Sequence, residues 1–455
     1  MSIEWMRGMV GYDRGICNGN ISNSALYFRG YIVSLPPHKT KRAKKVLRHK
    51  LLLILFILSF GSLQAQVTSD LVVESYLKET GIPITENNKV ELLLSGHDKF
   101  VDLFDAIRQA RHHIHLEYFN FRNDSIANAL FDLLAKKAAE GVEVRAMFDA
   151  FGNSSNNQPL KKKHLEKITS KGIEIVKFDP VTFPWINHVF SRDHRKIVVV
   201  DGIWGYTGGM NIADYYIEGL PELGDWRDIH MRLEGDAVRY LQGIFLDMWN
   251  KESGQHIGGP EYFPEPLTVP DTLRRTIGIV DRVPHKTPRS INRAYVAAID
   301  AAQSNIQIIN PYFVPTKSIR KAIKRALKRG VEVEIMVPAK SDIPFTPEAY
   351  YYIGNKLRKK GAKVYLFNGG FHHSKVMMVD SIFCTVGTAN LNSRSLRYDY
   401  ETNAFILTPA TTHELNGLFS RDKQNSTLMT RQLWKERSTW KKIVGWVGNL
   451  LTPFI

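Results

Sequence analysis

The feature that most constrains the fold of this chain is an internal repeat. The segment GVEVRAMFD at residues 141–149 returns as GVEVEIMVP at residues 330–338, with starts 189 positions apart (141 against 330). GIEIVKF at residues 172–178 returns as GAKVYLF at residues 361–367 with the same offset. Because similar segments recur in the same order, the sequence predicts two copies of one folding unit.

Within each copy, helical and strand patterns alternate. Residues 101–119 read as an amphipathic helix that passes into a strand, and residues 294–313 repeat this plan. Such alternation is typical of α/β folds whose strands are covered on both faces. The repeat therefore predicts two duplicated α/β halves that pack about a pseudo-two-fold axis.

Composition divides the chain into five segments. Residues 1–38 form a leader of unknown role, and residues 39–66 combine a basic cluster with an apolar run. The repeat units occupy residues 85–255 and 276–455, and residues 256–275 between them are rich in proline and glycine. That composition is typical of a linker.

The basic and apolar segment has the layout of a signal sequence. Seven basic residues and no acid precede the apolar run, and small and polar residues follow it up to a candidate cleavage site near Ala65. Extended to Leu63, the apolar part would make about 20 Å of helix, whereas a bilayer core is about 30 Å thick. These lengths favour an export or membrane-targeting signal over a spanning anchor.

The charge of the chain indicates an anionic partner. The 61 Lys+Arg against 45 Asp+Glu give a formal net charge of +16. Phosphate, nucleic acid and an acidic lipid surface all fit such an excess, so charge leaves the choice among them open. The two cysteines support neither a disulfide framework nor a cysteine-rich metal site.

Each repeat contains the same set of polar residues. Residues 194–201 read HRKIVVVD and residues 373–380 read HSKVMMVD, and a glycine and an asparagine follow each at matching positions. On a strand, residues two apart lie on one side, so the histidine and the lysine of each motif should point to the same place. The two sets are His194, Lys196, Asp201, Gly208 and Asn211, and His373, Lys375, Asp380, Gly387 and Asn390.

Two such motifs suit displacement at a phosphodiester. One neutral imidazole attacks phosphorus while the other, protonated, gives its proton to the departing alcohol, and the ordinary histidine pKa near ~6.5 makes both states accessible. The lysines and asparagines would hold the phosphoryl oxygens, so neither a metal ion nor a cofactor is required. Within the catalytic set, we expect Asp201 and Asp380 to hold backbone and lysine geometry.

The doubled motif resembles the phospholipase D superfamily, and the segments around it resemble bacterial cardiolipin synthases. The likeness extends over residues 85–455 and includes WRDIHMRLEG, INPYFVP and residues 372–406. It implies two phospholipase D-like α/β/α sandwich domains with the active site at their interface. Those synthases usually carry two amino-terminal spanning helices, whereas this chain has one short apolar segment. That departure concerns location more than chemistry.

The resemblance also implies roles for single residues. His194 would form a phosphatidyl-histidine intermediate, and His373 would act first as general acid and then as general base. Family members place a carboxylate behind each histidine to set its tautomer. By position in the matched motifs, Glu401 is the expected partner of His194 and Asp228 that of His373.

The resulting hypothesis is a phosphatidyltransferase that converts two phosphatidylglycerol molecules into cardiolipin and glycerol. A hydrolytic phospholipase D, a nuclease of the same superfamily and a lipid-binding protein without activity are the alternatives. The expected partners are phosphatidylglycerol and a membrane surface, without nucleic acid, and a monomer suffices because one chain carries both motifs. We expect membrane association in the bacterial cell envelope, at the inner membrane or on its periplasmic side.

The carboxyl-terminal residues 431–455 read as an amphipathic helix with a basic start. Tryptophan and lysine on such a helix suit the interface of an anionic bilayer, and a terminal helix packed on its domain is the alternative. The sequence leaves both open. The apolar face comprises Trp440, Ile443, Val444, Trp446, Val447, Leu450 and Leu451, and the basic start comprises Lys435, Arg437, Lys441 and Lys442.

Overall fold

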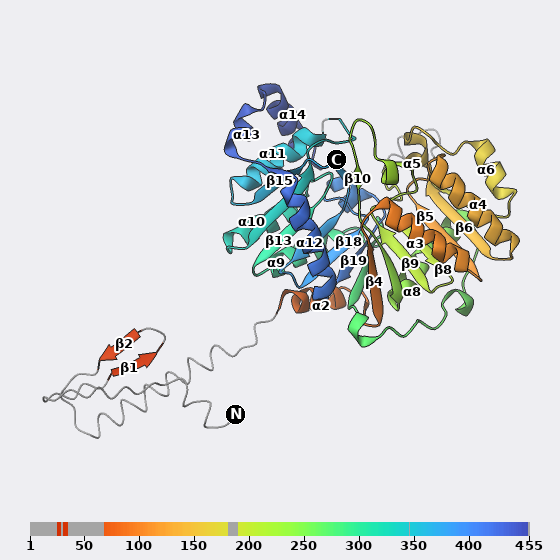
Figure 1. Ribbon diagram of the computed structural model, residues 1–455, viewed down its shortest axis with the longest axis horizontal. Coiled ribbons are helices and arrows are strands. Elements are labelled where there is room, and N and C mark those ends of the chain that lie inside the picture. Colours follow the sequence, from red (N-terminus) through yellow and green to blue (C-terminus); the bar gives the residue numbers. More distant parts are fainter. Residues whose placement is uncertain (1–24, 29–30, 35–67, 181–189, 345, 454–455) are drawn as a thin grey trace, which may run out of the picture. The chain divides into compact units, whose positions relative to one another are not determined.

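Two β-sheets with matching strand orders organise the carboxyl-terminal unit of the chain, residues 68–455 (Figure 1). Residues 1–67 form a separate unit, in which β1 (Ala25–Phe28) pairs antiparallel with β2 (Tyr31–Ser34). The expected signal at residues 39–66 lies outside the described residues and stays a prediction. The structure, a computed structural model, describes residues 25–28, 31–34, 68–180, 190–344 and 346–453.

The first sheet has seven strands and is built from the first repeat. Its strands follow the order β4 (Asn88–Leu93), β11 (His230–Gly235), β9 (Trp204–Gly208), β8 (Lys196–Val200), β5 (His113–Tyr118), β6 (Glu143–Asp149) and β7 (Glu174–Phe178). The second sheet has nine strands, in the order β20 (Ser426–Leu428), β15 (Lys363–Phe367), β14 (Glu332–Pro338), β13 (Asn305–Ile309), β17 (Val376–Val379), β18 (Phe383–Gly387), β19 (Glu401–Ile406), β12 (Ile277–Arg282) and β3 (Ile84–Thr85).

The seven strands of the first sheet have equivalents in the second. Read from β4 to β7, the first sheet matches the second read from β12 to β15, strand for strand. The senses agree as well, because β5, β6 and β7 run parallel, as do β13, β14 and β15, while the other neighbours are antiparallel. The prediction of two duplicated α/β domains is confirmed.

Helices cover the sheets in layers (Figure 1). Side chains of β8 alternate between two cores, with Val198 and Val200 in the core of the first domain, and Ile197 and Val199 in a core shared with the second sheet. Helices α8 and α12 contribute to that shared core. The helices are α2 (Ser69–Glu79), α3 (Gly96–Gln109), α4 (Ser125–Ala139), α5 (Ala150–Ser155), α6 (Lys162–Thr169), α7 (Tyr215–Glu218), α8 (Ala237–Ser253), α9 (Ser290–Ala301), α10 (Lys317–Lys328), α11 (Thr346–Arg358), α12 (Pro409–Gln424), α13 (Arg431–Glu436) and α14 (Thr439–Leu450).

The beginning of the carboxyl-terminal unit packs with the second domain. Val73 and Leu77 of α2 are fully buried in the core of the second domain, and β3 pairs antiparallel with β12. The carboxyl-terminal unit therefore begins on the second sheet and then crosses to β4 at the edge of the first. No repeat pattern in the sequence predicted this exchange.

Candidate active site

Two short backbone pairings join the domains, and these crossings position the histidine motifs. His194 lies in extended chain just before β8, and its backbone N–H donates to the carbonyl of Tyr400 at 3.0 Å. Asp193 and Tyr400 form a parallel bridge, and the next residue, Glu401, begins β19. The first histidine is therefore tied to a strand of the second domain.

The second crossing repeats the first with the domains exchanged. The short strands β10 (Trp226–Arg227) and β16 (Phe371–His372) pair in parallel. The backbone N–H of His373 donates to the carbonyl of Arg227 at 2.6 Å, and Asp228 follows directly. Each histidine thus lies next to a carboxylate of the opposite domain.

A buried carboxylate contacts each imidazole. Glu401 Oε1 and Oε2 lie 3.0 and 3.1 Å from Nδ1 of His194. Asp228 Oδ2 lies 2.7 Å from Nδ1 of His373. Both carboxylates are fully buried, whereas the side chains of His194 and His373 are 15% and 8% exposed. An Nδ1–H that donates to a carboxylate leaves Nε2 of the same ring unprotonated and reactive.

The two carboxylates occupy equivalent positions in the repeat. The glycine of each motif pairs with a residue of β11 or β19, and the carboxylate lies two residues before that partner in both domains. Asp228 and Glu401 therefore correspond to each other. Thr388 also donates to Glu401 through Oγ1, and the backbone N–H of Ile229 donates to Asp228 at 2.8 Å. These bonds fix the carboxylates that orient the rings.

The two lysines of the motifs reach back to their own histidines. Lys196 Nζ donates to the carbonyl of His194 at 2.7 Å. Lys375 Nζ donates to the carbonyl of His373 and lies 2.8 Å from Nδ1 and 3.1 Å from Nε2 of that ring. The sequence predicted that each histidine and its lysine lie on one strand. Instead, both histidines precede their strands, β8 and β17, because those segments form the crossings to the opposite domain.

Burial keeps both imidazoles neutral when no substrate is bound. It lowers the pKa of His194 to about 4 and the pKa of His373 to about 3. The ammonium groups of Lys196 and Lys375 lower both values further, while the carboxylates oppose the shifts. The expectation of ordinary histidine pKa values is therefore wrong for the free protein, because a poorly solvated site beside two cations disfavours imidazolium.

The lysines and the carboxylates of the site are also shifted. Burial lowers the pKa of Lys196 to about 7 and that of Lys375 to about 8. Burial alone would raise the pKa values of Asp228 and Glu401, but the neighbouring lysine and histidine groups lower both below their ordinary values. Both carboxylates are therefore ionised at neutral pH, and the lysines titrate close to it.

The motif aspartates lie at the opposite end of their strands. Asp201 accepts hydrogen bonds from the backbone N–H groups of residues 111–113 at 2.8 to 3.0 Å, and Asp380 accepts from residues 303–305 at 2.7 to 3.0 Å. Each aspartate lies five positions after its lysine, which is about 16 Å along an extended chain. The aspartates fix the backbone, and the expectation that they also hold the lysines is wrong.

The two asparagines leave polar atoms unsatisfied. Asn211 and Asn390 are 5% and 6% exposed, and neither Oδ1 atom has a hydrogen-bond partner among the described residues. A buried amide without a partner is costly unless a ligand or water completes its bonding. Both residues follow the short strands β9 and β18 that carry the motif glycines.

Sequence reasoning missed a buried lysine beside the first asparagine. Lys99 of α3 is fully buried, and its Nζ donates to the carbonyl of Asn211 at 3.0 Å. Burial lowers its pKa, and the charge of Asp228 opposes that shift. Lys99 lies outside both motifs, in a segment whose helical pattern gave no sign of a polar task.

Sequence reasoning also missed the aromatic surroundings of the second histidine. The ring of Tyr312 lies 5.9 Å from that of His373, and its hydroxyl donates to both carboxylate oxygens of Asp342 at 2.8 Å. Trp226 lies 5.3 Å from the same ring. Tyr312 belongs to INPYFVP, a segment noted in the sequence without a role for the tyrosine.

Comparison with known sequences gives one consistent family. A family profile described as "Cardiolipin synthase, PLD-like domain" matches residues 103–224 and again residues 295–423. The cardiolipin synthase of Listeria monocytogenes serotype 4b (strain CLIP80459) is 36% identical over 382 residues, which are 83% of this chain and 78% of that protein. The cardiolipin synthase of Oceanobacillus iheyensis is 34% identical over 384 residues, covering 84% of this chain and 79% of that protein.

Solved structures share the fold at low sequence identity. The crystal structure of phosphatidylserine synthase from Haemophilus influenzae Rd KW20 covers 86% of this chain and 100% of its own, with a TM-score of 0.63 at 14% identity. The polyphosphate kinase of Porphyromonas gingivalis covers 79% of this chain and 52% of its own, with a TM-score of 0.50 at 13% identity. At such identities the likeness concerns the fold alone.

Proposed function

The chain belongs to the cardiolipin synthase family of the phospholipase D superfamily, and from that premise we propose that it is a phosphatidyltransferase that makes cardiolipin. It transfers the phosphatidyl group of one phosphatidylglycerol to the terminal glycerol hydroxyl of a second and releases glycerol. The observation that carries this proposal is the crossed pairing of His194 with Glu401 and of His373 with Asp228.

In the first step His194 is the nucleophile. Its Nδ1–H donates to Glu401, and its Nε2 lone pair attacks phosphorus. The N–P bond forms as the bond between phosphorus and the glycerol oxygen breaks, and His373 gives a proton to that oxygen. Two contacts support this assignment. Lys196 bonds the carbonyl of His194, whereas Lys375 Nζ lies within hydrogen-bond distance of Nε2 on His373. The ammonium makes His373 the weaker nucleophile.

In the second step the direction of proton transfer reverses. His373, now neutral, takes the proton from the hydroxyl of a second phosphatidylglycerol. That oxygen attacks phosphorus, the N–P bond breaks, and His194 leaves as a neutral imidazole. The product carries two phosphatidyl groups on one glycerol, and the site returns to its starting protonation state.

His373 takes up the proton for the first step when the substrate binds. The pKa of His373 is about 3 in the free site, so its ring is neutral at pH 7. A phosphodiester anion favours the charged form of a nearby imidazole and so raises that pKa. Lys375 is largely protonated at pH 7 because its pKa is about 8, and its Nζ lies 3.1 Å from Nε2. This ammonium stays charged beside the phosphate, and the ring takes its proton from solvent.

The remaining charges bind the phosphoryl group. Lys196 and Lys375 are fully or almost fully buried, and cations in such a site act strongly on developing negative charge. Asn211 and Asn390, whose side-chain N–H groups can donate to phosphate oxygens, complete the set. We assign these four residues to the non-bridging phosphate oxygens, with Asp201 and Asp380 as supports of the strands that carry the motifs.

A lipid assay tests the activity. Purified protein is incubated with phosphatidylglycerol vesicles, and the products are separated and identified by mass spectrometry. We expect cardiolipin and glycerol, and a loss of about 10³-fold or more in His194→Ala and His373→Ala, the order of general acid–base contributions. His97→Ala is the matched control, because that side chain is 75% exposed on α3.

Each alternative activity has its own product in this assay. Accumulation of phosphatidic acid without cardiolipin would assign the protein to hydrolytic phospholipases. Cleavage of plasmid DNA in a parallel reaction, abolished by the same two variants, would assign it to the nucleases of the superfamily. Binding of lipid without any product would leave only a lipid-binding protein.

We further propose that the enzyme is membrane-associated in the bacterial cell envelope and that α14 contacts the lipid surface. Gly445 is buried, and its α-carbon faces Glu348 and Tyr352 of α11 so closely that a Cβ would lie 2.4 Å from the Glu348 carbonyl. The opposite side of α14 remains apolar and exposed, with Trp440 69% and Trp446 49% exposed. One side of α14 is thus packed on its domain, and the exposed apolar side is the one that we assign to the lipid surface.

The composition of the exposed side fits an anionic bilayer. Ile443 and Leu450 are 46% and 54% exposed, and Lys441 at the start of the helix adds charge to an exposed surface. Tryptophan, aliphatic and lysine side chains together are typical of helices that lie in the membrane interface. Among the residues that the structure describes, none of the helices has the length and hydropathy needed to span a bilayer.

Vesicle flotation tests this contact separately from catalysis. Trp440→Ser together with Trp446→Ser should reduce binding to phosphatidylglycerol vesicles about tenfold or more, because interfacial binding scales with buried apolar area. Activity on detergent-solubilised substrate should persist. The exposed apolar pair Leu71→Ser and Val72→Ser on α2 is the control. Unchanged flotation of the tryptophan variant would remove α14 from the membrane contact and leave the catalytic proposal intact.

A further inference from the structure

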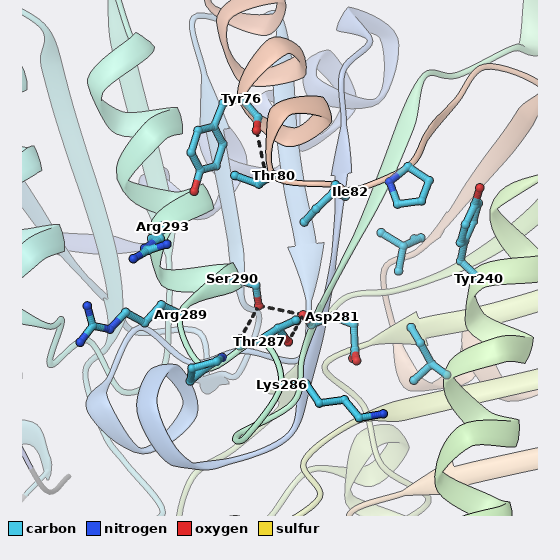
Figure 2. A pocket seen from close by; sticks show the side chains of 15 residues that line it. Tyr76, Thr80, Ile82, Tyr240, Asp281, Lys286, Thr287, Arg289, Ser290 and Arg293 are labelled. Carbon is cyan, nitrogen blue, oxygen red and sulfur yellow. Dashed lines mark hydrogen bonds between the residues drawn. The ribbon is translucent and has the colours of Figure 1, made fainter.

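A cavity lies apart from the residues of the two histidine motifs (Figure 2). It is bounded by the end of α2, by α8, by β12 and by the start of α9, and its volume is about 660 Å³. Sites for small ligands usually have about 300 to 1,000 Å³. None of the motif residues lines it, so the reaction proposed above leaves this cavity without a task.

One side of the cavity is apolar. Ile82 and Pro83, which follow α2, contribute one part of this wall, and Tyr240 and Ile244 of α8 contribute another. Ile279 of β12 completes it and is 7% exposed. Figure 2 shows Ile82 above the space and Tyr240 across it. This wall offers a surface for an aliphatic chain.

The other side is cationic. Lys286, Arg289 and Arg293 line the cavity, and all three are exposed. None of them forms an ion pair with a carboxylate in the described part of the chain, although many other surface cations do. Arg289 and Arg293 lie one helical turn apart at the start of α9, where like charges repel unless an anion lies between them, and Figure 2 shows Lys286 pointing to the other side.

Three other polar residues of the cavity, Asp281, Thr287 and Ser290, already have partners. The carboxylate of Asp281 accepts two hydrogen bonds from Arg195, at 2.6 and 2.8 Å, and one from Thr402 at 2.9 Å. The hydroxyls of Ser290 and Thr287 donate to the backbone carbonyl of Asp281 at 2.7 and 3.1 Å, as drawn in Figure 2. The cations are left as the groups that a ligand would pair.

We propose that this cavity binds an amphiphile with a phosphate head and an aliphatic tail. The head lies between Arg289 and Arg293, because guanidinium groups pair with phosphate through parallel hydrogen bonds. The tail covers the wall formed by Ile82 and Ile244. Free phosphate would leave the apolar wall exposed to water, and a neutral aliphatic molecule would leave the cations unpaired. A molecule with both a phosphate head and an aliphatic tail satisfies both sides of the cavity. This inference does not depend on the reaction at the histidine pair.

Asp281 links the cavity to the active site. Arg195, which bonds Asp281, lies in the sequence between His194 and Lys196. Thr402, which also bonds Asp281, follows Glu401. Substitution of Asp281 would therefore disturb the catalytic set, and the test is confined to the exposed arginines.

Photolabelling locates the ligand directly. A decyl phosphate that carries a diazirine near the end of its tail is irradiated with the full-length protein, and labelled peptides are mapped by mass spectrometry. We expect label on the peptides that contain Ile82 and Ile244, in addition to any label at the active site. Arg289→Ala together with Arg293→Ala should reduce that labelling tenfold or more, and replacement of both by lysine should retain part of it.

Matched controls separate the head from the tail. Lys321→Ala with Lys324→Ala on α10 removes the same charge from an exposed helix and should leave labelling unchanged. Unlabelled decyl phosphate should compete, whereas inorganic phosphate and decyl glucoside at the same concentration should compete at least tenfold less. Equal competition by inorganic phosphate would make this an anion site only. Equal competition by the glucoside, or labelling unaffected by the arginine variant, would overturn phosphate recognition.

Discussion

At the scale of single residues, the reactivity of each histidine depends on a carboxylate from the other domain. Glu401 is fully buried, and it accepts from His194 and from Thr388. Its charge favours the protonated form of the His194 ring, which burial disfavours. A neutral side chain of the same shape would keep the contact but lose that charge and the fixed tautomer.

We therefore expect Glu401→Gln to lower kcat by about 10³-fold with little change in KM, because a carboxylate-to-amide change behind a catalytic histidine acts on the reacting ring. Steady-state kinetics of cardiolipin formation measure it. The control is Glu334→Gln, a buried carboxylate that bonds Tyr365 and Lys423 away from the histidines. Comparable activity of the two variants would exclude the proposed role of Glu401.

The pH dependence of the reaction should follow the lysines. The pKa of Lys375 is lowered to about 8 and that of Lys196 to about 7, so both lose their protons as the pH rises from 7 to 9. The phosphate then loses its cationic partners, and kcat/KM, which reports the free enzyme, should fall over that range.

Lys196→Arg together with Lys375→Arg provides the test of that assignment, because guanidinium groups stay protonated throughout the range. A pH–rate profile of kcat/KM should show the alkaline limb of this variant displaced upward by a unit or more, even if its maximum is lower. An alkaline limb at the same pH in both proteins would mean that a different group titrates.

Part of this residue-scale account could be predicted from the sequence and part could not. The histidines, lysines and asparagines stand in repeated motifs, and Asp228 and Glu401 stand at fixed places beside them. The pKa values could not be predicted, because they result from burial and from charges that only the fold brings together. Lys99 was missed for the same reason, since its partner Asn211 is 112 positions away.

At the scale of elements, glycine positions decide how closely helices approach. In α14, a Cβ on Gly445 would lie 2.4 Å from the Glu348 carbonyl and 2.9 Å from Cβ of Tyr352. In α8, a Cβ on Gly243 would meet nothing within 4 Å. Replacement of glycine by alanine should therefore lower the stability at position 445 and raise it at position 243.

Gly445→Ala should push α14 away from α11 at a cost of about 1 to 2 kcal/mol, as for other overpacked sites. Hydrogen exchange in residues 440–450 should accelerate about tenfold. Gly243→Ala should leave that exchange unchanged and raise the free energy of unfolding by about 0.5 to 1 kcal/mol, the helix preference for alanine. Unchanged exchange in Gly445→Ala would mean that α14 is not packed as described.

The element pattern was easier to predict than the contacts of the elements. Apolar runs such as residues 196–200 indicated strands covered on both faces, and β8 is buried along its whole length. The amphipathic pattern of α14 predicted a helix, but the small residue that packs it, Gly445, carries no hydropathy signal. The place of α2 beside the second sheet was unpredictable from its own sequence, because only its partners define it.

At the scale of the whole molecule, one chain supplies both histidines and both carboxylates. Because each crossing joins the two domains of the same chain, a substituted histidine cannot be replaced from a second, intact motif elsewhere in that chain. The internal repeat predicted the two domains and their matching sheets. It did not predict the crossings, because they lie where the pairing passes from one repeat to the other.

Mixing His194→Ala chains with His373→Ala chains should therefore leave the sample inactive. Coexpression of the two variants, which allows chains to assemble while they fold, should give the same result in the cardiolipin assay. Recovery of about half of the activity of the unsubstituted protein would show that domains exchange between chains.

The central claim is that His194 carries the phosphatidyl group between the two substrates. Its most direct test is rapid acid-free quenching of the enzyme with phosphatidylglycerol, followed by proteolysis and mass spectrometry of the histidine peptides. The account predicts a phosphatidyl adduct on the peptide that contains His194, absent in His194→Ala. An adduct on His373, or none during active turnover, would contradict it.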